Sequence, residues 1–106
     1  KIKNDNKNAI NFYKKSIVVN PNYVDGWFNL GLGYASDNNN GKAKECFHHV
    51  ITLNPNYSYA YYALGIAYEQ DGNKKEALNN YKIFLTQTKD ENLAQVVQQK
   101  ITKLEK

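Results

Sequence analysis

The one cluster of potential metal-binding side chains in this sequence is Cys46-Phe47-His48-His49. Cys46 and His49 are three residues apart, so on a helix a thiolate and an imidazole would share one face. A structural zinc site needs four such ligands, and no second cluster in the sequence completes the set. We therefore interpret these residues as ordinary helix residues and predict neither a metal nor any other cofactor.

The acidic residues and the glycines also lack the spacing that catalysis or phosphate binding requires. The carboxylates are scattered and give no general acid–base pair; they include Asp25, Glu45, Glu69, Asp71 and Glu76. Gly31 and Gly33 lie inside a predicted helix and do not form the glycine-rich loop that cradles phosphate groups. The sequence therefore predicts a protein that is not an enzyme.

Charge and hydropathy argue against nucleic-acid binding and against a membrane span. The 106 residues carry a formal net charge of +4, and all 14 Lys and Arg residues are lysines. Arginine supplies many bidentate contacts to phosphates and bases, so its absence disfavours a nucleic-acid ligand. No apolar run approaches the roughly 20 residues that span a bilayer. The compartment is unknown and cytoplasmic by default, and the first residue, lysine rather than methionine, leads us to expect a fragment of a longer protein.

The stretch from Trp27 to Tyr34 sets the organisation of the chain. Trp27, Leu30, Gly31 and Tyr34 have the i, i+3, i+4, i+7 spacing of one helix face. Glycine inside a helix costs roughly 1 kcal/mol relative to alanine. Gly31 therefore indicates that a second helix packs closely against this position.

The same pattern returns with a period of 34 residues. Tyr61, Leu64, Gly65 and Tyr68 repeat the helix face, Asn54-Pro55-Asn56-Tyr57 repeats Asn20-Pro21-Asn22-Tyr23, and Ala9, Ala43 and Ala77 follow the same step. A fixed period of this size indicates stacked supersecondary units.

This pattern resembles that of the tetratricopeptide-repeat family. The family's Trp-x₂-Leu-Gly-x₂-Tyr…Ala-x₃-Phe…Pro pattern is matched by Trp27, Leu30, Gly31, Tyr34, Ala43, Phe47 and Pro55. The resemblance implies an all-α fold, a right-handed superhelix of stacked antiparallel helix pairs, with about six helices in all.

We expect a single domain over residues 1–106. It divides into the second helix of a partial repeat (5–23), two repeats (24–57 and 58–87) and a terminal capping helix (88–106). Asn73 and Glu76 predict a capping box before helix 74–87, and Thr88 with Glu91 predicts the start of the last helix. An apolar stripe should place that last helix over the preceding repeat; it consists of Leu93, Val96, Val97, Ile101 and Leu104. Asn38-Asn39-Asn40-Gly41 predicts an irregular turn, because the family usually places its glycine earlier.

In this family the first helices of successive repeats line a concave groove, so residues beside the packing face are implied to bind the ligand. These are Asp25, Phe28, Asn29 and Leu32 in one repeat and Tyr59, Tyr62, Ile66 and Glu69 in the next. Leu32 and Ile66 are equally consistent with ordinary core between repeats. We predict a protein–protein interaction module that binds a peptide or a partner helix.

Two alternatives concern the choice of partner. The first is the family's carboxylate clamp, a set of lysine, arginine and asparagine side chains that holds acidic C-terminal tails. Asn29 matches one clamp asparagine, but Tyr59 and Ala63 stand where the clamp has cationic side chains, which argues against a clamp here. The other alternative is a scaffold that forms homo-oligomers through its exposed terminal helices. Helix 5–19 has no first helix of its own, so we expect its face to be uncovered and the isolated chain to self-associate; this face comprises Ala9, Phe12, Tyr13 and Ser16, with Ile17 close by.

Overall fold

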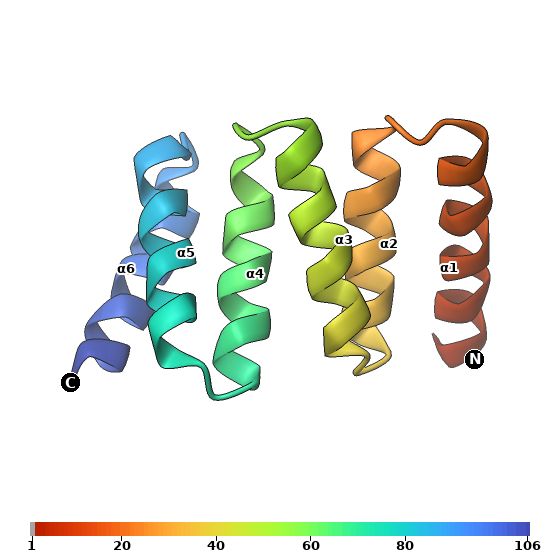
Figure 1. The fold of residues 1–106 in the computed structure, drawn as a ribbon. Helices are drawn as coiled ribbons and strands as arrows, with labels where there is room; N and C mark the ends of the chain where they lie inside the picture. The colour runs from red at the N-terminus through yellow and green to blue at the C-terminus, as the bar shows by residue number, and fades with distance from the viewer. Residues whose placement is uncertain (1) are drawn as a thin grey trace. The chain divides into compact units, whose positions relative to one another are not determined.

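The computed structural model describes the backbone of residues 2–106 and the side chains from residue 5 onward. This part of the chain contains six α-helices and no strand, so the predicted all-α class is confirmed. The helices are α1 (Ile2–Val19), α2 (Val24–Ser36), α3 (Asn40–Leu53), α4 (Ser58–Gln70), α5 (Lys74–Gln87) and α6 (Glu91–Glu105) (Figure 1). None of the described helices combines the length and the apolar content that crossing a bilayer demands.

The chain divides into two compact units, Lys1–Pro55 and Asn56–Lys106. In the first unit, α2 packs against both α1 and α3. One side chain from each helix forms the buried cluster Ile10, Leu30 and Cys46. The α1–α2 pair is also fixed by polar contacts, because Asn6 Nδ2 donates hydrogen bonds to the Gly33 carbonyl and to Asp37 Oδ1, both at 3.0 Å.

In the second unit, α5 packs against both α4 and α6. Its core contains Ala77, Tyr81 and Phe84 from α5 together with Val97 and Ile101 from α6. The predicted apolar stripe of the last helix therefore does cover α5. Val96 is the exception in that stripe, since 44% of its surface remains exposed.

The repeated glycines allow the helices of each pair to approach closely, as the sequence predicts. A Cβ atom built on Gly31 would lie 2.5 Å from Phe47 Cε1, and one built on Gly65 would clash with the ring of Tyr81. Phe47 and Tyr81 are 1% and 0% exposed. In each pair, then, an aromatic ring of the second helix fills the space that a side chain at the glycine would need.

The turns within the two helix pairs share one backbone conformation and one type of N-cap. Asn38, with a φ of 61°, takes the left-handed conformation that Gly72, with a φ of 78°, takes in the second pair. The next residue caps the following helix in both cases: the Asn73 side chain accepts from the Glu76 N–H, and the Asn39 side chain accepts from the Lys42 N–H. The prediction of an irregular turn is therefore wrong, because asparagine tolerates the left-handed region.

The start of α6 also differs from the prediction. Asp90 is the N-cap, and its Oδ1 accepts a hydrogen bond of 3.0 Å from the Leu93 N–H. Thr88 lies two residues earlier and accepts a 3.0 Å bond from the Asp90 N–H instead. Because the cap must directly precede the helix, Asp90 rather than Thr88 supplies it.

Candidate partner-binding faces of α2 and α4

The predicted binding residues of the first unit lie on α2. Asp25 and Leu32 are exposed, the latter over 42% of its surface, whereas Phe28 and Asn29 are half-buried. The Phe28 ring lies 5.7 Å from the buried ring of Phe47, with an interplanar angle of 49°. Phe28 is therefore anchored to the core of its own unit while part of its surface stays accessible.

The predicted tyrosines of the second unit lie on α4 and rest on a buried aromatic ring. Tyr59 is 44% exposed, its ring centroid lies 6.4 Å from that of Phe84, and its hydroxyl donates to Asp90 Oδ2 at 3.3 Å. Tyr62 is half-buried, with its ring 5.6 Å from Phe84 and 6.4 Å from Tyr81. Rings held in this way present contact area at a small cost in side-chain entropy.

Ile66 and Glu69 have structural contacts within the second unit. Ile66 is half-buried and packs against the core cluster of α5 and α6. Glu69 is exposed, and its Oε1 accepts a 2.6 Å hydrogen bond from the Tyr81 hydroxyl. Burial, and then this hydrogen bond, raise the pKa of the Tyr81 phenol well above its ordinary value. A ligand that bound Glu69 would have to compete with Tyr81.

The Tyr81–Glu69 pair is a contact that the sequence prediction missed. A signal for it exists, because Tyr81 occupies the position that Phe47 holds in the preceding repeat. A tyrosine buried in a core position needs an acceptor for its hydroxyl. Glu69, at the end of the facing helix, provides that acceptor.

Cys46 and His49 serve different packing contacts in the first unit. Cys46 is buried with Ile10 and Leu30, whereas the His49 ring lies 4.0 Å from the Trp27 ring. Burial, with a smaller contribution from Glu45, raises the pKa of the Cys46 thiol to about 11. Such a thiol stays protonated near neutral pH and is a poor nucleophile and metal ligand. Across the described residues, no group of three or more His, Cys, Asp or Glu side chains is placed to hold a metal ion.

Several solved structures resemble this chain, and two of the three described here are TPR structures by name. The crystal structure of MamA matches with a TM-score of 0.77 and 32% identity over 86% of this chain, which spans 52% of that one. The TPR2B domain of yeast Sti1, in its complex with pHsp70, matches with a TM-score of 0.86 and 22% identity, covering 98% of this chain and 86% of that one. The first TPR of Spaghetti (RPAP3), bound to the HSP90 peptide SRMEEVD, matches with a TM-score of 0.80 and 20% identity, covering 93% and 82%.

Sequence comparison gives the same result at the level of single repeats. No curated protein matches this chain. Two sequence models, both of the tetratricopeptide repeat, match residues 24–57 and residues 46–79. The chain belongs to the tetratricopeptide-repeat family.

Proposed function

We propose that this chain is a non-enzymatic protein–protein interaction module. Its ligand, a peptide or a partner helix, binds the faces of α2 and α4 that carry the eight predicted binding residues. The proposal rests on Tyr59 and Tyr62. Both rings contact the buried ring of Phe84, and both side chains remain partly exposed to solvent. Rigid aromatic side chains of this kind are frequent anchors of binding energy. Family members of known structure, among them Sti1 and RPAP3, are found in complex with protein or peptide partners, which supports the general role.

The chemistry of the α4 face favours an apolar or aromatic ligand over an acidic tail. Tyr59 and Ala63 occupy the positions at which a carboxylate clamp would need cations. Tyr59 donates a hydrogen bond to the Asp90 carboxylate, and this negative charge would repel an acidic ligand. We therefore propose that the tyrosines bind their ligand mainly through ring surface and that this module is not a carboxylate clamp.

The test uses a peptide selected on the folded chain from a displayed library, with its affinity measured by calorimetry. Tyr59→Ala and Tyr62→Ala should each weaken binding by roughly 1–3 kcal/mol. Val96→Ala is the matched control, because Val96 on α6 is 44% exposed, as Tyr59 is on α4. Far-UV circular dichroism should show that each variant keeps its helix content.

The decisive variant replaces Phe28, Tyr59 and Tyr62 together with alanine. If this triple variant binds the selected peptide with the affinity of the parent, the assignment of the ligand to these faces is wrong.

A further inference from the structure

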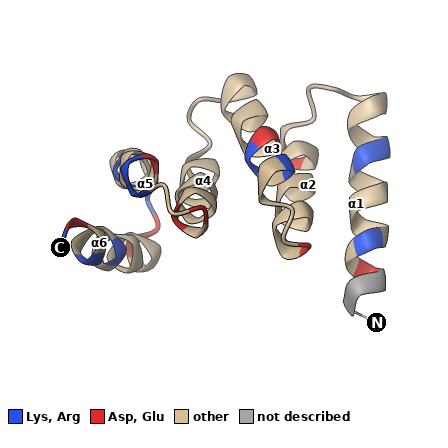
Figure 2. Cartoon of the chain, turned by 60° about the horizontal axis from the view of Figure 1, so that its bottom comes forward, with Lys and Arg blue, Asp and Glu red and all other residues tan. Residues whose placement is uncertain are grey.

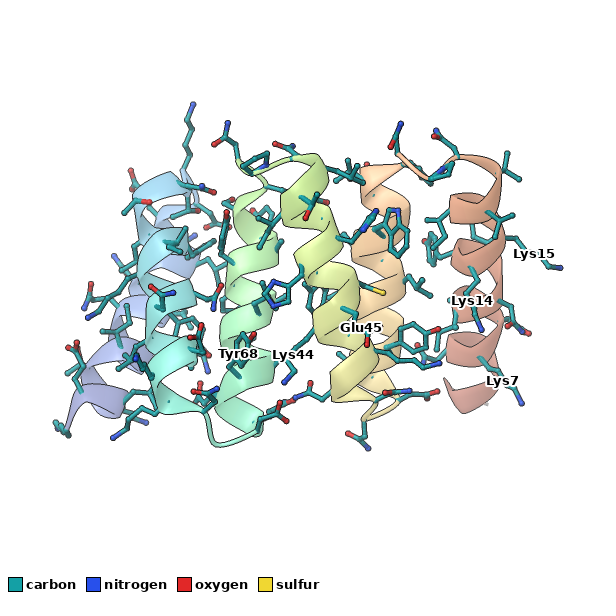
Figure 3. All side chains as sticks on the ribbon, viewed as in Figure 1. Lys7, Lys14, Lys15, Lys44, Glu45 and Tyr68 are labelled. Carbon is teal, nitrogen blue, oxygen red and sulfur yellow. The ribbon has the colours of Figure 1, made fainter. Side chains whose placement is uncertain are left out.

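The two helices that carry the candidate binding faces contain no basic residue. Glu69 is the only charged residue of α4 (Ser58–Gln70), and Asp25 is the only charged residue of α2. The described lysines lie on the other four helices or in the segments that flank α6 (Figure 2). In the first unit, for example, Lys14 lies on α1 and Lys44 on α3 (Figure 3). Although the whole chain has a net charge of +4, the charges of α2 and α4 are therefore negative.

The candidate binding residues of α4 form one stripe along the helix. They are Tyr59, Tyr62, Ile66 and Glu69. Their spacing of i, i+3, i+7 and i+10 keeps all four within about 80° of the helix circumference. Glu69 is exposed and lies about 15 Å along the helix axis from Tyr59. The stripe therefore has aromatic and aliphatic side chains over most of its length and a carboxylate at its C-terminal end.

A second carboxylate lies at the N-terminal end of the stripe. The Tyr59 hydroxyl donates to Asp90 Oδ2 at 3.3 Å, while Asp90 Oδ1 caps α6. Neither Asp90 nor Glu69 forms a salt bridge with another described residue. The exposed Lys89 precedes Asp90 in the chain, yet it forms no salt bridge with that carboxylate. Both ends of the stripe therefore carry a negative charge that is not neutralised by an ion pair within the described chain.

Tyr59 and Asp90 together have the composition of a site for a cationic side chain. The Tyr59 ring is 44% exposed, and its centroid lies 6.4 Å from that of the buried Phe84. An ammonium or guanidinium group is attracted to the face of an aromatic ring. A carboxylate beside the ring adds a charge-assisted hydrogen bond. Because the Tyr59 hydroxyl contacts the Asp90 carboxylate directly, one cationic side chain is attracted to both groups at the same place.

Glu69 acts on a ligand through its charge rather than as a primary contact. Its Oε1 already accepts a 2.6 Å hydrogen bond from the Tyr81 hydroxyl. That bond leaves the negative charge of the carboxylate in place, and Glu69 is exposed. Its charge therefore favours a cationic ligand along the stripe, with a smaller effect than that of Asp90.

We propose that the α4 face binds a cationic peptide of a partner protein. An arginine or lysine of the peptide lies over the Tyr59 ring beside Asp90, and an apolar side chain packs on Tyr62 and Ile66. This inference rests on the proposed function, because it assigns the charge of the ligand that the tyrosines bind. A second copy of the chain docked α4 against α4 fits less well, since it would bring the carboxylates of both copies together.

The test begins with peptides selected on the folded chain from a displayed library that has no charge bias. The selected peptides should contain lysine and arginine more often than the unselected library, and aspartate and glutamate less often. One selected peptide is then synthesised together with a variant in which glutamine replaces every lysine and arginine. Calorimetry should show at least tenfold tighter binding of the cationic peptide, and added salt should reduce the difference.

Two conservative variants remove the charges of the stripe and keep its structural contacts. Asp90→Asn retains an N-cap for α6, since asparagine caps as well as aspartate, and should weaken binding of the cationic peptide about three- to fivefold. Glu69→Gln retains an acceptor for the Tyr81 hydroxyl and should weaken binding about twofold. Glu105→Gln is the matched control, because it removes one carboxylate at the far end of α6 and should leave the affinity unchanged. Far-UV circular dichroism and the melting temperature should match the parent in the Asp90 and Glu69 variants.

Three results would overturn the proposal. The first is a selected set without enrichment in lysine and arginine, and the second is a cationic peptide whose affinity is the same for Asp90→Asn as for the parent. If Tyr62→Ala still weakens binding in these two cases, the proposed function stands and only the assigned charge of the ligand is wrong. The third is binding that responds to Asp90→Asn but not to Tyr62→Ala, because the peptide would then not lie on the tyrosines and the proposed function would fail as well.

Discussion

Replacing Gly65 by alanine should destabilise the second unit, because the ring of Tyr81 occupies the space that the new methyl group needs. The added Cβ would clash with ring carbons Cδ1 and Cε1 and would lie 3.0 Å from Cζ. Tyr81 is 0% exposed, and its hydroxyl is bound to Glu69 at 2.6 Å. The ring is therefore buried and tied at its hydroxyl, so a shift away from the new methyl group would disturb its packing or this hydrogen bond.

The size of this effect follows from two opposing terms. Alanine improves helix propensity over glycine by about 1 kcal/mol. Overpacking of a well-packed core typically costs about 1–3 kcal/mol. Because the methyl group meets the middle of a fixed ring rather than a flexible chain end, we take the upper part of that range and expect a net loss of about 1–2 kcal/mol.

Gly41→Ala is the matched control in the first unit. Gly41 lies in the first turn of α3, and a Cβ there would meet nothing within 4 Å. This variant should gain about 0.5–1 kcal/mol. Urea unfolding followed by far-UV circular dichroism measures both changes. A Gly65→Ala variant as stable as the parent, beside a stabilised Gly41→Ala variant, would refute the close packing of Tyr81 on Gly65.

Two further predictions concern the cores of the two units. Ala77 is 0% exposed, so Ala77→Leu should lose about 1–3 kcal/mol through overpacking, and an unchanged melting temperature would contradict the packing of α5. The pKa of Cys46 rises from 9.0 to about 11 on folding, so from pH 9 to 11 the folded chain binds more protons than the unfolded chain, and its stability should fall. The free energy of unfolding should fall by up to about 1.4 kcal/mol per pH unit. Urea titrations between pH 9 and 11 should show this fall, and Cys46→Val should reduce it. If the pH dependence of stability is the same in Cys46→Val as in the parent, the thiol is not buried as described.

The helices were predictable because their signals are local and periodic. The pattern of Leu30, Gly31 and Tyr34 specifies one helix face wherever it occurs, and its return after 34 residues fixes the second pair. The small residues at the crossing points, Ala43 and Ala77, are both 0% exposed as that pattern requires. The predicted helix 74–87 has the bounds of α5.

The candidate site was less predictable, because the role of a half-exposed side chain depends on partners elsewhere in the chain. Tyr62 contacts rings on α5, and Glu69 accepts from Tyr81, twelve residues away. Helical spacing places both residues beside the packing face of α4, but it does not reveal these contacts. The eight predicted binding residues therefore remain a prediction, and Tyr59, which is 44% exposed, is the clearest candidate among the aromatics.

The residues on the exposed face of α1 were also only partly predictable from the sequence. The sequence predicted Tyr13 on that face, but Tyr13 packs with Ile17 around the buried Ile10. The exposed apolar surface is instead centred on Phe12 and Val19. The packing of α2 decides which side of α1 is buried, and that contact cannot be read from α1 alone.

The exposed faces of α1 and α6 differ in their composition. The exposed face of α6 presents polar side chains: Gln95, Gln98, Gln99, Thr102 and Lys103. The outer face of α1 presents Phe12 and Val19 although neither side chain is needed to fill its own unit. Leaving a large apolar side chain exposed forgoes roughly 1.5–3 kcal/mol of burial. Since Phe12 is 62% exposed, Phe12→Lys should leave the helix content and the melting temperature of the parent unchanged, and a clear fall in the melting temperature would show that this side chain contributes to the packing of α1.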